Sequence, residues 1–183
     1  VAGMRVLDAG CGTGRNLVYL LRSGFEVFAV DESDGAVAQT RRLAATLAPH
    51  LPANNFRTEP VERMSFPDAT FDVVLSSAVL HFARDEEQWN SMVREMWRVL
   101  KPDGIFFARL ASSIGIENRV KLIVERRYDL PDGSQRFLVD EAMLLSVTGE
   151  LGGEFIEPIK TTIVQNMRAM TTWCLRKQGG ASE

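Results

Sequence analysis

The 183 residues of this chain match the size of a single domain and can bury a substantial core, so we expect one domain over residues 1–183. Hydrophobic residues make up 45% and charged residues 25% of the sequence, which is the balance of a globular protein rather than a disordered one. With 21 basic and 24 acidic side chains the net charge is -3, so an overall positive field that would attract nucleic acid or an anionic membrane is excluded.

Cysteine and histidine usage excludes two further classes of protein. Cys11 and Cys174 stand far apart and form no C-x-x-C pair, so neither a disulfide framework nor a zinc knuckle is indicated. This usage fits a cytoplasmic protein. No apolar run approaches the ~20 residues that span a bilayer, and no leader pattern opens the chain, so we expect no membrane association. With two histidines and no clustered ligands, we expect no metal centre.

The first 60 residues alternate between strand and helix patterns. Three strands are expected here, at 4–9, at 25–30 and, more weakly, around Phe56. Between them, an apolar helix stops at Ser23 and Gly24, and a second helix begins at Ser33 or Asp34 and ends before Pro49. The pattern predicts a repeated strand-helix unit.

The middle of the chain continues this alternation. A fourth strand is expected at 71–76, and the clearest helix follows it, because apolar residues recur from Trp89 to Leu100 at intervals of three and four. That helix is expected to end at the Lys-Pro-Asp-Gly sequence of 101–104, before a fifth strand at 105–110. Alternating strands and helices predict a mainly parallel sheet covered on both faces, which is the doubly wound α/β arrangement.

The last third of the chain departs from the alternation. After a basic segment and a turn at 131–134, a helix is expected at 140–151. Two β-like runs follow, at 155–165 and 169–176, and the link between them is too short for a crossover helix. The sheet is therefore predicted to end with an antiparallel strand.

A glycine-rich loop and an acidic residue indicate a ligand site. The sequence VLDAGCGTG at 6–14 places three glycines between a strand and a helix, where a ligand can lie against the main chain. The spacing is not the G-x-G-x-x-G of dinucleotide sites, since Arg15 stands where the third glycine would be. Asp31 ends the second strand, where a carboxylate can accept both hydroxyls of a ribose. Together they predict an adenosine pocket without a phosphate clamp.

With these features the chain resembles the class I S-adenosylmethionine-dependent methyltransferases, of the methyltransferase type 11 kind, over at least residues 4–110. Residues 6–14 resemble the first motif of that family, residues 66–72 (FPDATFD) its lead into strand four, and residues 98–104 (RVLKPDG) its turn into strand five. The resemblance implies a Rossmann-like, doubly wound sheet of seven strands, mostly parallel with an antiparallel C-terminal strand. It also implies S-adenosyl-L-methionine as cofactor.

The resemblance assigns residues to that cofactor. The implied cofactor-binding residues are Asp8, Gly10, Cys11, Gly12, Asp31, Glu32, Val61, Glu62, Ser76 and Ser77. Within this set, Asp8 and the glycines surround the methionine moiety, Asp31 binds the ribose, and Glu32 lies beside the adenine. Cys11 fills a slot for a small residue rather than reacting.

Two departures from the family pattern stand out. Family members commonly carry an Asp that accepts a hydrogen bond from the adenine amino group, and Pro60 holds that place here. Val61 can still offer its backbone N–H, and Glu62 can supply the missing acceptor. Family members also usually carry lid helices before strand one, whereas three residues precede Met4. Either upstream residues are missing or the lid is reduced.

Two residues are candidates for contact with the methyl acceptor. His81 follows strand four and can accept a proton, although a structural role is the alternative. Arg109, near the end of strand five, can face the acceptor. Further basic side chains follow at Arg119, Lys121, Arg126, Arg127 and Arg136. These would suit an anionic acceptor, and a solvated surface is the alternative.

The predicted function is transfer of a methyl group from S-adenosylmethionine to a small-molecule substrate, with an anionic acceptor as one option. Two alternatives stay open. The first is methylation of RNA or protein, although no Asn/Asp-Pro-Pro-Tyr motif follows strand four, where residues 76–79 read Ser-Ser-Ala-Val. The second is a non-catalytic, regulatory protein that binds the cofactor, because a fold does not by itself establish turnover. The oligomeric state stays undetermined.

Overall fold

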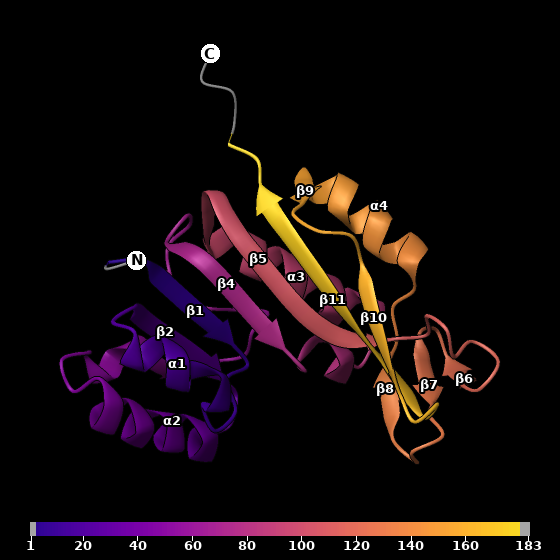
Figure 1. Cartoon of the computed structure of the whole chain (residues 1–183), viewed down its shortest axis with the longest axis horizontal. Helices are drawn as coiled ribbons and strands as arrows, with labels where there is room; N and C mark the ends of the chain where they lie inside the picture. The colour runs from indigo at the N-terminus through magenta and orange to yellow at the C-terminus, as the bar shows by residue number, and fades with distance from the viewer. Residues whose placement is uncertain (1–2, 180–183) are drawn as a thin grey trace.

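The computed structural model describes residues 3–179 and contains one large twisted sheet with helices packed against it (Figure 1). Its strands are β1 (Arg5–Ala9), β2 (Glu26–Asp31), β3 (Phe56–Thr58), β4 (Phe71–Ser77), β5 (Leu100–Ser112), β9 (Gly153–Phe155), β10 (Lys160–Val164) and β11 (Arg168–Lys177). Seven of them follow the order β10-β11-β5-β4-β1-β2-β3, and the short β9 pairs with β11. Strands β1 to β5 pair in parallel, and β11 runs antiparallel to β5. The predicted α/β, Rossmann-like sheet is confirmed.

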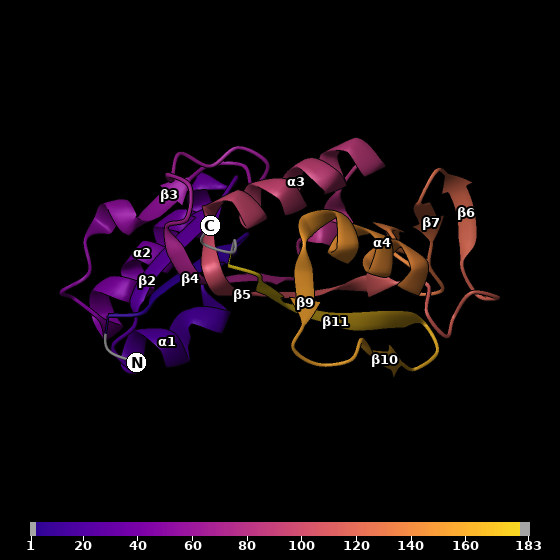
Figure 2. The ribbon, with the colours of Figure 1, turned by 90° about the horizontal axis from the view of Figure 1, so that it is seen from above.

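The helices cover both faces of the sheet. They are α1 (Val18–Arg22), which follows the 3-10 turn η1 (Arg15–Leu17), α2 (Asp34–Leu47), α3 (Glu86–Val99) and α4 (Glu141–Leu151), with the 3-10 turns η2 (Ala53–Asn55) and η3 (Leu80–Phe82). Side-chain caps begin three of them, because Ser33, Asp85 and Asp140 each accept a hydrogen bond from a backbone N–H three residues later. Figure 2 shows α3 on one face and α1 on the other.

Two hydrophobic clusters hold these layers together. On the face of α1 and α2, the core contains Leu17, Val37 and Ala44. On the face of α3 and α4, the core is aromatic, and Trp89 and Trp173 stack with their ring centroids 6.1 Å apart. The predicted apolar face of α3 is confirmed, since Trp89 and Met96 are fully buried. Burial on both faces explains why the central parallel strands are nearly continuous in apolar residues.

The antiparallel end of the sheet agrees with the prediction of a hairpin. The turn between β10 and β11 places both Gln165 and Asn166 at positive φ (50° and 55°), and Met167 N–H donates to the Val164 carbonyl at 2.9 Å. Two successive residues at positive φ form the tight turn whose twist matches that of the strands. The run expected at 155–165 is interrupted, however, because β9 ends at Phe155 and β10 begins only at Lys160. Pro158, which has no N–H for a strand ladder, lies in the gap.

Two regions differ from the sequence-based expectation. Strand β5 begins at Leu100, so residues 101–104 open the strand instead of forming a turn after the helix, and a bulge opposite Asp72 absorbs the irregularity. The basic segment forms a second, three-stranded sheet that was not predicted. It consists of β6 (Lys121–Val124), β7 (Arg127–Asp129) and β8 (Gln135–Phe137). Within residues 3–179, no helix combines the length and apolar character needed to cross a membrane.

Candidate functional site

A cavity of about 420 Å³, called the main cavity below, opens where β1, β2 and β4 end. Its lining residues are Gly10, Cys11, Gly12, Thr13, Arg15, Asn16, Asp31, Glu32, Pro60, Val61, Glu62, Ser77, Ala78, Val79, Phe82, Ala83, Gln88 and Met92. The connections from β1 and from β4 leave in opposite directions along the sheet, toward β2 and toward β5. The main cavity therefore lies at the switch point where open α/β sheets bind ligands.

The glycine loop and Asp31 meet in the main cavity. Gly12 N–H donates a hydrogen bond to Asp31 Oδ2 at 2.8 Å, and Ser33 N–H donates to Asp31 Oδ1 at 3.0 Å. The backbone N–H groups of Gly10 and Cys11 both donate to the Val30 carbonyl at 2.9 Å. These contacts fasten the loop after β1 to the end of β2. Asp31 thereby stays at the cavity wall with further lone pairs available to a ligand.

Gly10 and Gly12 adopt left-handed backbone conformations, with φ of 83° and 52°. A Cβ at Gly10 would lie 2.4 Å from Val79 Cγ2, so the close approach of the loop to Val79 requires glycine. A Cβ at Gly12 would meet no atom within 4 Å. Since Gly12 lines the main cavity, its bare main chain leaves space that a side chain would occupy.

Asp8 and Ser76 are buried and do not belong to the lining of the main cavity, although Ser77, next to Ser76, does. Their residues are 0% and 1% exposed, and in the described residues neither carboxylate oxygen of Asp8 nor Ser76 Oγ has a hydrogen-bond partner. Burial, and next the charge of Asp31, raise the pKa of Asp8 to about 7. Buried polar atoms without partners are costly in a native protein and are typical of functional sites.

Cys11 lines the main cavity but is unsuited to act as a nucleophile. Burial raises the pKa of its thiol to about 12, although a hydrogen bond with Thr40 partly opposes that rise. The thiol therefore stays protonated at neutral pH. Thr40 Oγ1 donates to the Gly12 carbonyl at 2.9 Å and so connects α2 to the glycine loop.

Another part of the wall of the main cavity comes from the segment between β3 and β4, which carries Pro60, Val61 and Glu62. Val61 is buried, and Glu62 Oε1 accepts a hydrogen bond from Gln88 Nε2 at 2.9 Å. Gln88 lies in the first turn of α3 and was not identified from the sequence. The only sequence signal for Gln88 was that it is a polar residue in the first turn of the helix that follows β4.

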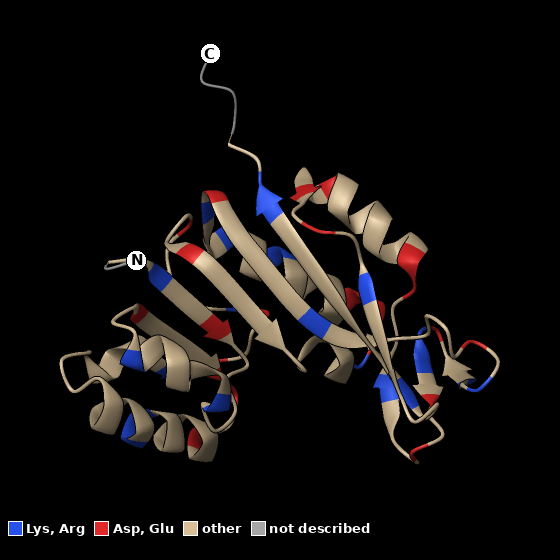
Figure 3. Ribbon diagram, viewed as in Figure 1, with Lys and Arg blue, Asp and Glu red and all other residues tan. Residues whose placement is uncertain are grey.

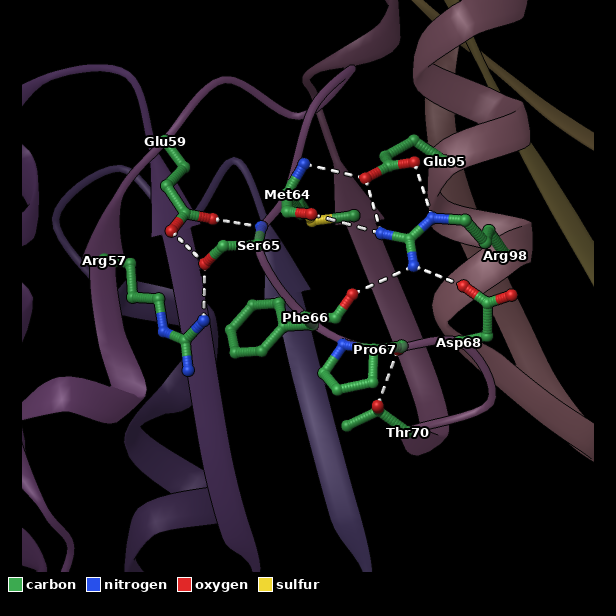
Figure 4. A network of polar contacts seen from close by, with 10 residues as sticks. All are labelled: Arg57, Glu59, Met64, Ser65, Phe66, Pro67, Asp68, Thr70, Glu95 and Arg98. Atoms are coloured by element: carbon green, nitrogen blue, oxygen red, sulfur yellow. Dashed lines mark hydrogen bonds and ion pairs between the residues drawn. The ribbon is translucent and has the colours of Figure 1, made fainter.

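A polar network holds this segment in place (Figure 4). The guanidinium of Arg98, on α3, donates to Glu95 Oε1 at 2.7 Å and to Asp68 Oδ1 at 2.6 Å, and it also donates to the carbonyls of Met64 and Phe66. Met64 N–H donates back to Glu95 Oε1 at 2.7 Å. The hydrogen bonds from Arg98 hold the pKa of Glu95 below its usual value, although burial acts in the opposite direction. One side chain thus fastens residues 64–68 to α3.

Arg98→Met is expected to lower the free energy of unfolding by about 2 kcal/mol, because charge-assisted hydrogen bonds contribute about 1.5–3 kcal/mol when partly buried acceptors lose their donor. Chemical denaturation measures this change. Arg94→Met, on an exposed position of the same helix, is the matched control and should change stability by less than about 0.5 kcal/mol. Equal stabilities of the two variants would contradict the positioning role of Arg98.

His81 and Arg109 lie outside the main cavity. Both line an adjoining recess of about 280 Å³, called the arginine recess below. His81 is 7% exposed, and its Nδ1 accepts a hydrogen bond from Ala111 N–H at 3.2 Å. Burial lowers the pKa of His81 to about 4, and the charges of Arg136, Arg109 and Arg168 act in the same direction. The imidazole is therefore neutral at pH 7, and it connects η3 to β5.

The chemistry of the main cavity fits S-adenosylmethionine. Gly12 presents open main chain and Asp31 presents a carboxylate to a diol. The buried carboxylate of Asp8, which has no hydrogen-bond partner in the described residues, is close enough to Asp31 for the two charges to interact. An adenosyl ligand that carries a cationic methionine moiety can use each of these features. No phosphate-binding side chain is needed for such a ligand.

Two comparisons of sequence agree with this geometry. The family model described as methyltransferase domain matches residues 7–108. A malonyl-[acyl-carrier protein] O-methyltransferase from Enterobacter lignolyticus is 33% identical over 152 residues, which cover 82% of this chain and 55% of that protein. A ubiquinone biosynthesis O-methyltransferase from Methylocella silvestris is 34% identical over 106 residues, which cover 58% of this chain and 39% of that protein. The chain thus spans about half or less of the length of these curated relatives.

Solved structures share the fold. The crystal structure of 1,6-didemethyltoxoflavin-N1-methyltransferase from Burkholderia thailandensis, with 1,6-didemethyltoxoflavin and S-adenosylhomocysteine bound, superposes with a TM-score of 0.74. The two proteins are 22% identical, and the match covers 97% of this chain and 72% of that one. The family model itself spans more than half of the chain, from β1 to β5, and includes the glycine loop and Asp31. The chain therefore belongs to the methyltransferase domain family, that of the class I S-adenosylmethionine-dependent methyltransferases.

Proposed function

We propose that this chain is one methyltransferase domain that binds S-adenosylmethionine in the main cavity and transfers its methyl group to a small-molecule acceptor. The observation that carries the proposal is the contact between Gly12 N–H and Asp31 at 2.8 Å. This contact places open main chain and a diol-binding carboxylate at neighbouring strand ends, in a cavity at the switch point of the sheet.

The proposed roles of the residues follow their positions. Asp31 accepts hydrogen bonds from the ribose hydroxyls, and Glu32 lies beside the adenine. Val61 offers its backbone N–H to the adenine, and Glu62, held by Gln88, offers a carboxylate oxygen to the adenine amino group. The methionine moiety is assigned to Asp8, Gly10, Cys11, Gly12, Ser76 and Ser77. In this set, Asp8 and Ser76 are buried and do not line the cavity.

When bound, S-adenosylmethionine supplies a methyl group that an acceptor lone pair attacks in line, while the carbon-sulfur electron pair stays on sulfur and S-adenosylhomocysteine remains. The contribution of this chain is to hold and align the reactants, and aligned reactions reach effective molarities on the order of 10⁵ to 10⁸ M. A pKa of about 4 makes His81 a weak base, and its Nδ1 already accepts from Ala111. We therefore assign His81 to positioning and Arg109 to the acceptor.

Three observations support a small acceptor. The main cavity measures about 420 Å³, which is within the size range of small-molecule sites, and the adjoining recess of about 280 Å³ is close to the lower end of that range. The net charge of -3 offers no general attraction to nucleic acid. Two of the similar proteins are named for small molecules, toxoflavin and ubiquinone. The malonyl-[acyl-carrier protein] O-methyltransferase is named for an acceptor that includes a carrier protein, so an acceptor carried on a protein stays the alternative.

Calorimetric titration with S-adenosylhomocysteine tests the cofactor assignment, and a methyl-release assay over a panel of small acceptors tests turnover. Binding of the product without turnover on any acceptor would favour the non-catalytic alternative. Absence of binding would contradict the proposal as a whole.

A pair of glycine variants tests where the cofactor lies. Gly12→Ala is expected to weaken S-adenosylhomocysteine binding by about tenfold, or about 1.4 kcal/mol, because the added methyl group occupies ligand space. Gly24→Ala is the matched control, since Gly24 also has positive φ and open space around a Cβ but lies outside the main cavity. Both variants should lose about 1–2 kcal/mol of stability to left-handed backbone strain. Equal affinities in the two variants would contradict the placement.

A further inference from the structure

The arginine recess borders the main cavity. Three residues line both spaces, namely Arg15, Ala78 and Phe82. A molecule held in the arginine recess can therefore extend past Ala78 and Phe82 into the main cavity. The arginine recess therefore adjoins the space that the cofactor would fill, and it can hold an acceptor beside it.

Four arginines from separate parts of the chain line the arginine recess. They are Arg15 in η1, Arg109 in β5, Arg136 in β8 and Arg168 at the start of β11. Figure 3 shows basic positions on β5 and β8 and near the turn between β10 and β11. The chain as a whole is acidic, with a net charge of -3, so this concentration of positive charge is local.

The positive charge of the arginine recess is only partly neutralised. Among residues 3–179, neither Arg15 nor Arg109 has a carboxylate within 4.0 Å. Arg168 pairs with Asp132, the one acidic residue in the lining, at 4.0 Å. The guanidinium carbon of Arg136 lies 4.9 Å from the centroid of the Phe82 ring. The lining of the arginine recess therefore carries four arginines and one carboxylate, that of Asp132.

The buried imidazole of His81 responds to this charge. After burial, the three influences that lower its pKa are the charges of Arg136, Arg109 and Arg168. Three arginines from three strands thus act on one point in the wall of the recess. Because His81 stays neutral, it adds no positive charge of its own to the recess. The arginines therefore remain available to bind a ligand.

We propose that the arginine recess binds an oxyanion group, a carboxylate or a phosphate, of the methyl acceptor. This inference rests on the proposed function, since it assigns the acceptor to the space beside the cofactor. Arginine suits the task, because its planar guanidinium donates two parallel hydrogen bonds to either group. The three-stranded sheet and the hairpin of β10 and β11 then have a shared role, which is to supply Arg136 and Arg168.

Calorimetric titration with citrate and, separately, with pyrophosphate tests the proposal. The protein is first saturated with S-adenosylhomocysteine, so that the main cavity is occupied, and ionic strength is held constant. At least one anion should bind with 1:1 stoichiometry. Tighter binding of citrate would indicate a carboxylate acceptor, and tighter binding of pyrophosphate a phosphate acceptor. Failure of both anions to bind would overturn the proposal.

Charge-removing variants identify the site of binding. Arg109→Gln and Arg168→Gln should each weaken the anion by about tenfold, as expected for loss of one charge-assisted contact, and both arginines are exposed enough for the variants to fold. Arg42→Gln, on the exposed face of α2, is the matched control and should leave binding unchanged. Equal affinities in all three variants would overturn the proposal.

The two proposals fail in distinguishable ways. If S-adenosylhomocysteine binds and neither anion does, the cofactor assignment stands and the oxyanion subsite is wrong. If S-adenosylhomocysteine does not bind, the proposed function fails, and the anion titration of the unliganded protein with the same variants still tests the arginine recess.

Discussion

Asp8→Asn is expected to make the protein more stable at pH 8 and to weaken its binding of the cofactor product. In the folded chain the Asp8 carboxylate is fully buried without a hydrogen-bond partner in the described residues, and its pKa is about 7 instead of 3.8. Ionising this group therefore costs free energy in the folded state alone. Asn has nearly the same shape and carries no charge at any pH.

The sign of the effect follows from the raised pKa of Asp8. Below about pH 3 the group is protonated in both the folded and the unfolded chain, so burying it costs no ionisation free energy. Between pH 3.8 and about 7 the unfolded chain ionises first, so stability is lost as pH rises through that window. The gain from Asp8→Asn should be close to zero at pH 4 and at least about 1 kcal/mol at pH 8, since one pKa unit corresponds to about 1.36 kcal/mol and the buried amide offsets part of it.

Chemical denaturation of both proteins at pH 4 and pH 8 measures this effect. Asp72→Asn is the matched control on the neighbouring strand β4. Burial opposes ionisation of Asp72, yet hydrogen bonds from Lys101 and Arg5 outweigh it and lower the pKa of Asp72. That variant should therefore lose stability at pH 8. Equal stability of the wild type and of Asp8→Asn at pH 8 would show that other groups offset the cost of burying the Asp8 carboxylate, and it would contradict the prediction.

The cost of Asp8 to stability has a functional counterpart. S-adenosylhomocysteine carries a cationic amino group, and an ionised Asp8 near it would gain an electrostatic partner. Affinity for S-adenosylhomocysteine in the wild type should therefore rise between pH 6 and pH 8 as Asp8 ionises, and it should be flat over this range in Asp8→Asn. At pH 8 the variant should bind about tenfold more weakly, or by about 1.4 kcal/mol. Titration calorimetry at three pH values measures both quantities.

Asp31→Ala should weaken S-adenosylhomocysteine binding by at least about 30-fold, which is about 2 kcal/mol. Two contributions add in the same direction. The variant removes the acceptor for the ribose hydroxyls, and it also leaves Gly12 N–H and Ser33 N–H without the carboxylate that now holds them at 2.8 and 3.0 Å. The glycine loop is then less well ordered before the ligand binds.

Asp34→Ala is the matched control for Asp31→Ala, because Asp34 is an exposed acidic residue at the start of α2 and lies outside the main cavity. Its affinity should stay within about twofold of the wild type, which is about 0.4 kcal/mol. Circular dichroism and thermal melting establish that both variants are folded. An Asp31→Ala variant that binds as tightly as Asp34→Ala would remove the central element of the proposed pocket.

The parts of the fold that could be predicted are those whose local sequence carries a strong signal. The apolar run before Gly10, the cap at Ser33, and the three- and four-residue spacing from Trp89 onward identify β1, α2 and α3. The resemblance to the methyltransferase family then supplied the number of strands in the sheet. Each of these signals arises within a few residues of the chain, which is why no partner in space is needed to recognise it.

The three-stranded sheet had no such signal. Its strands have three or four residues, and all four residues of β6 are exposed, so no alternation of apolar and polar positions marks them. Their pairing with one another, and the packing of β8 against η3 and β5, stabilise them instead. Residues 101–104 were misassigned for a related reason. Proline and glycine indicate a turn, whereas residues 101–104 form a bulge within β5, between the pair Leu100 and Phe71 and the pair Ile105 and Val73, and Lys101 contacts Asp72.

By itself, the sequence determined the α/β class, the glycine loop and the acidic residue that ends the second strand, because these depend on local backbone preferences and short spacings. Only the tertiary structure decided that Asp8 is buried with no hydrogen-bond partner in the described residues, that burial and nearby arginines keep His81 neutral, and that four arginines spread over 154 positions border one recess. Burial and charge proximity depend on which distant segments pack together, and the spacing of residues along the chain does not determine that packing.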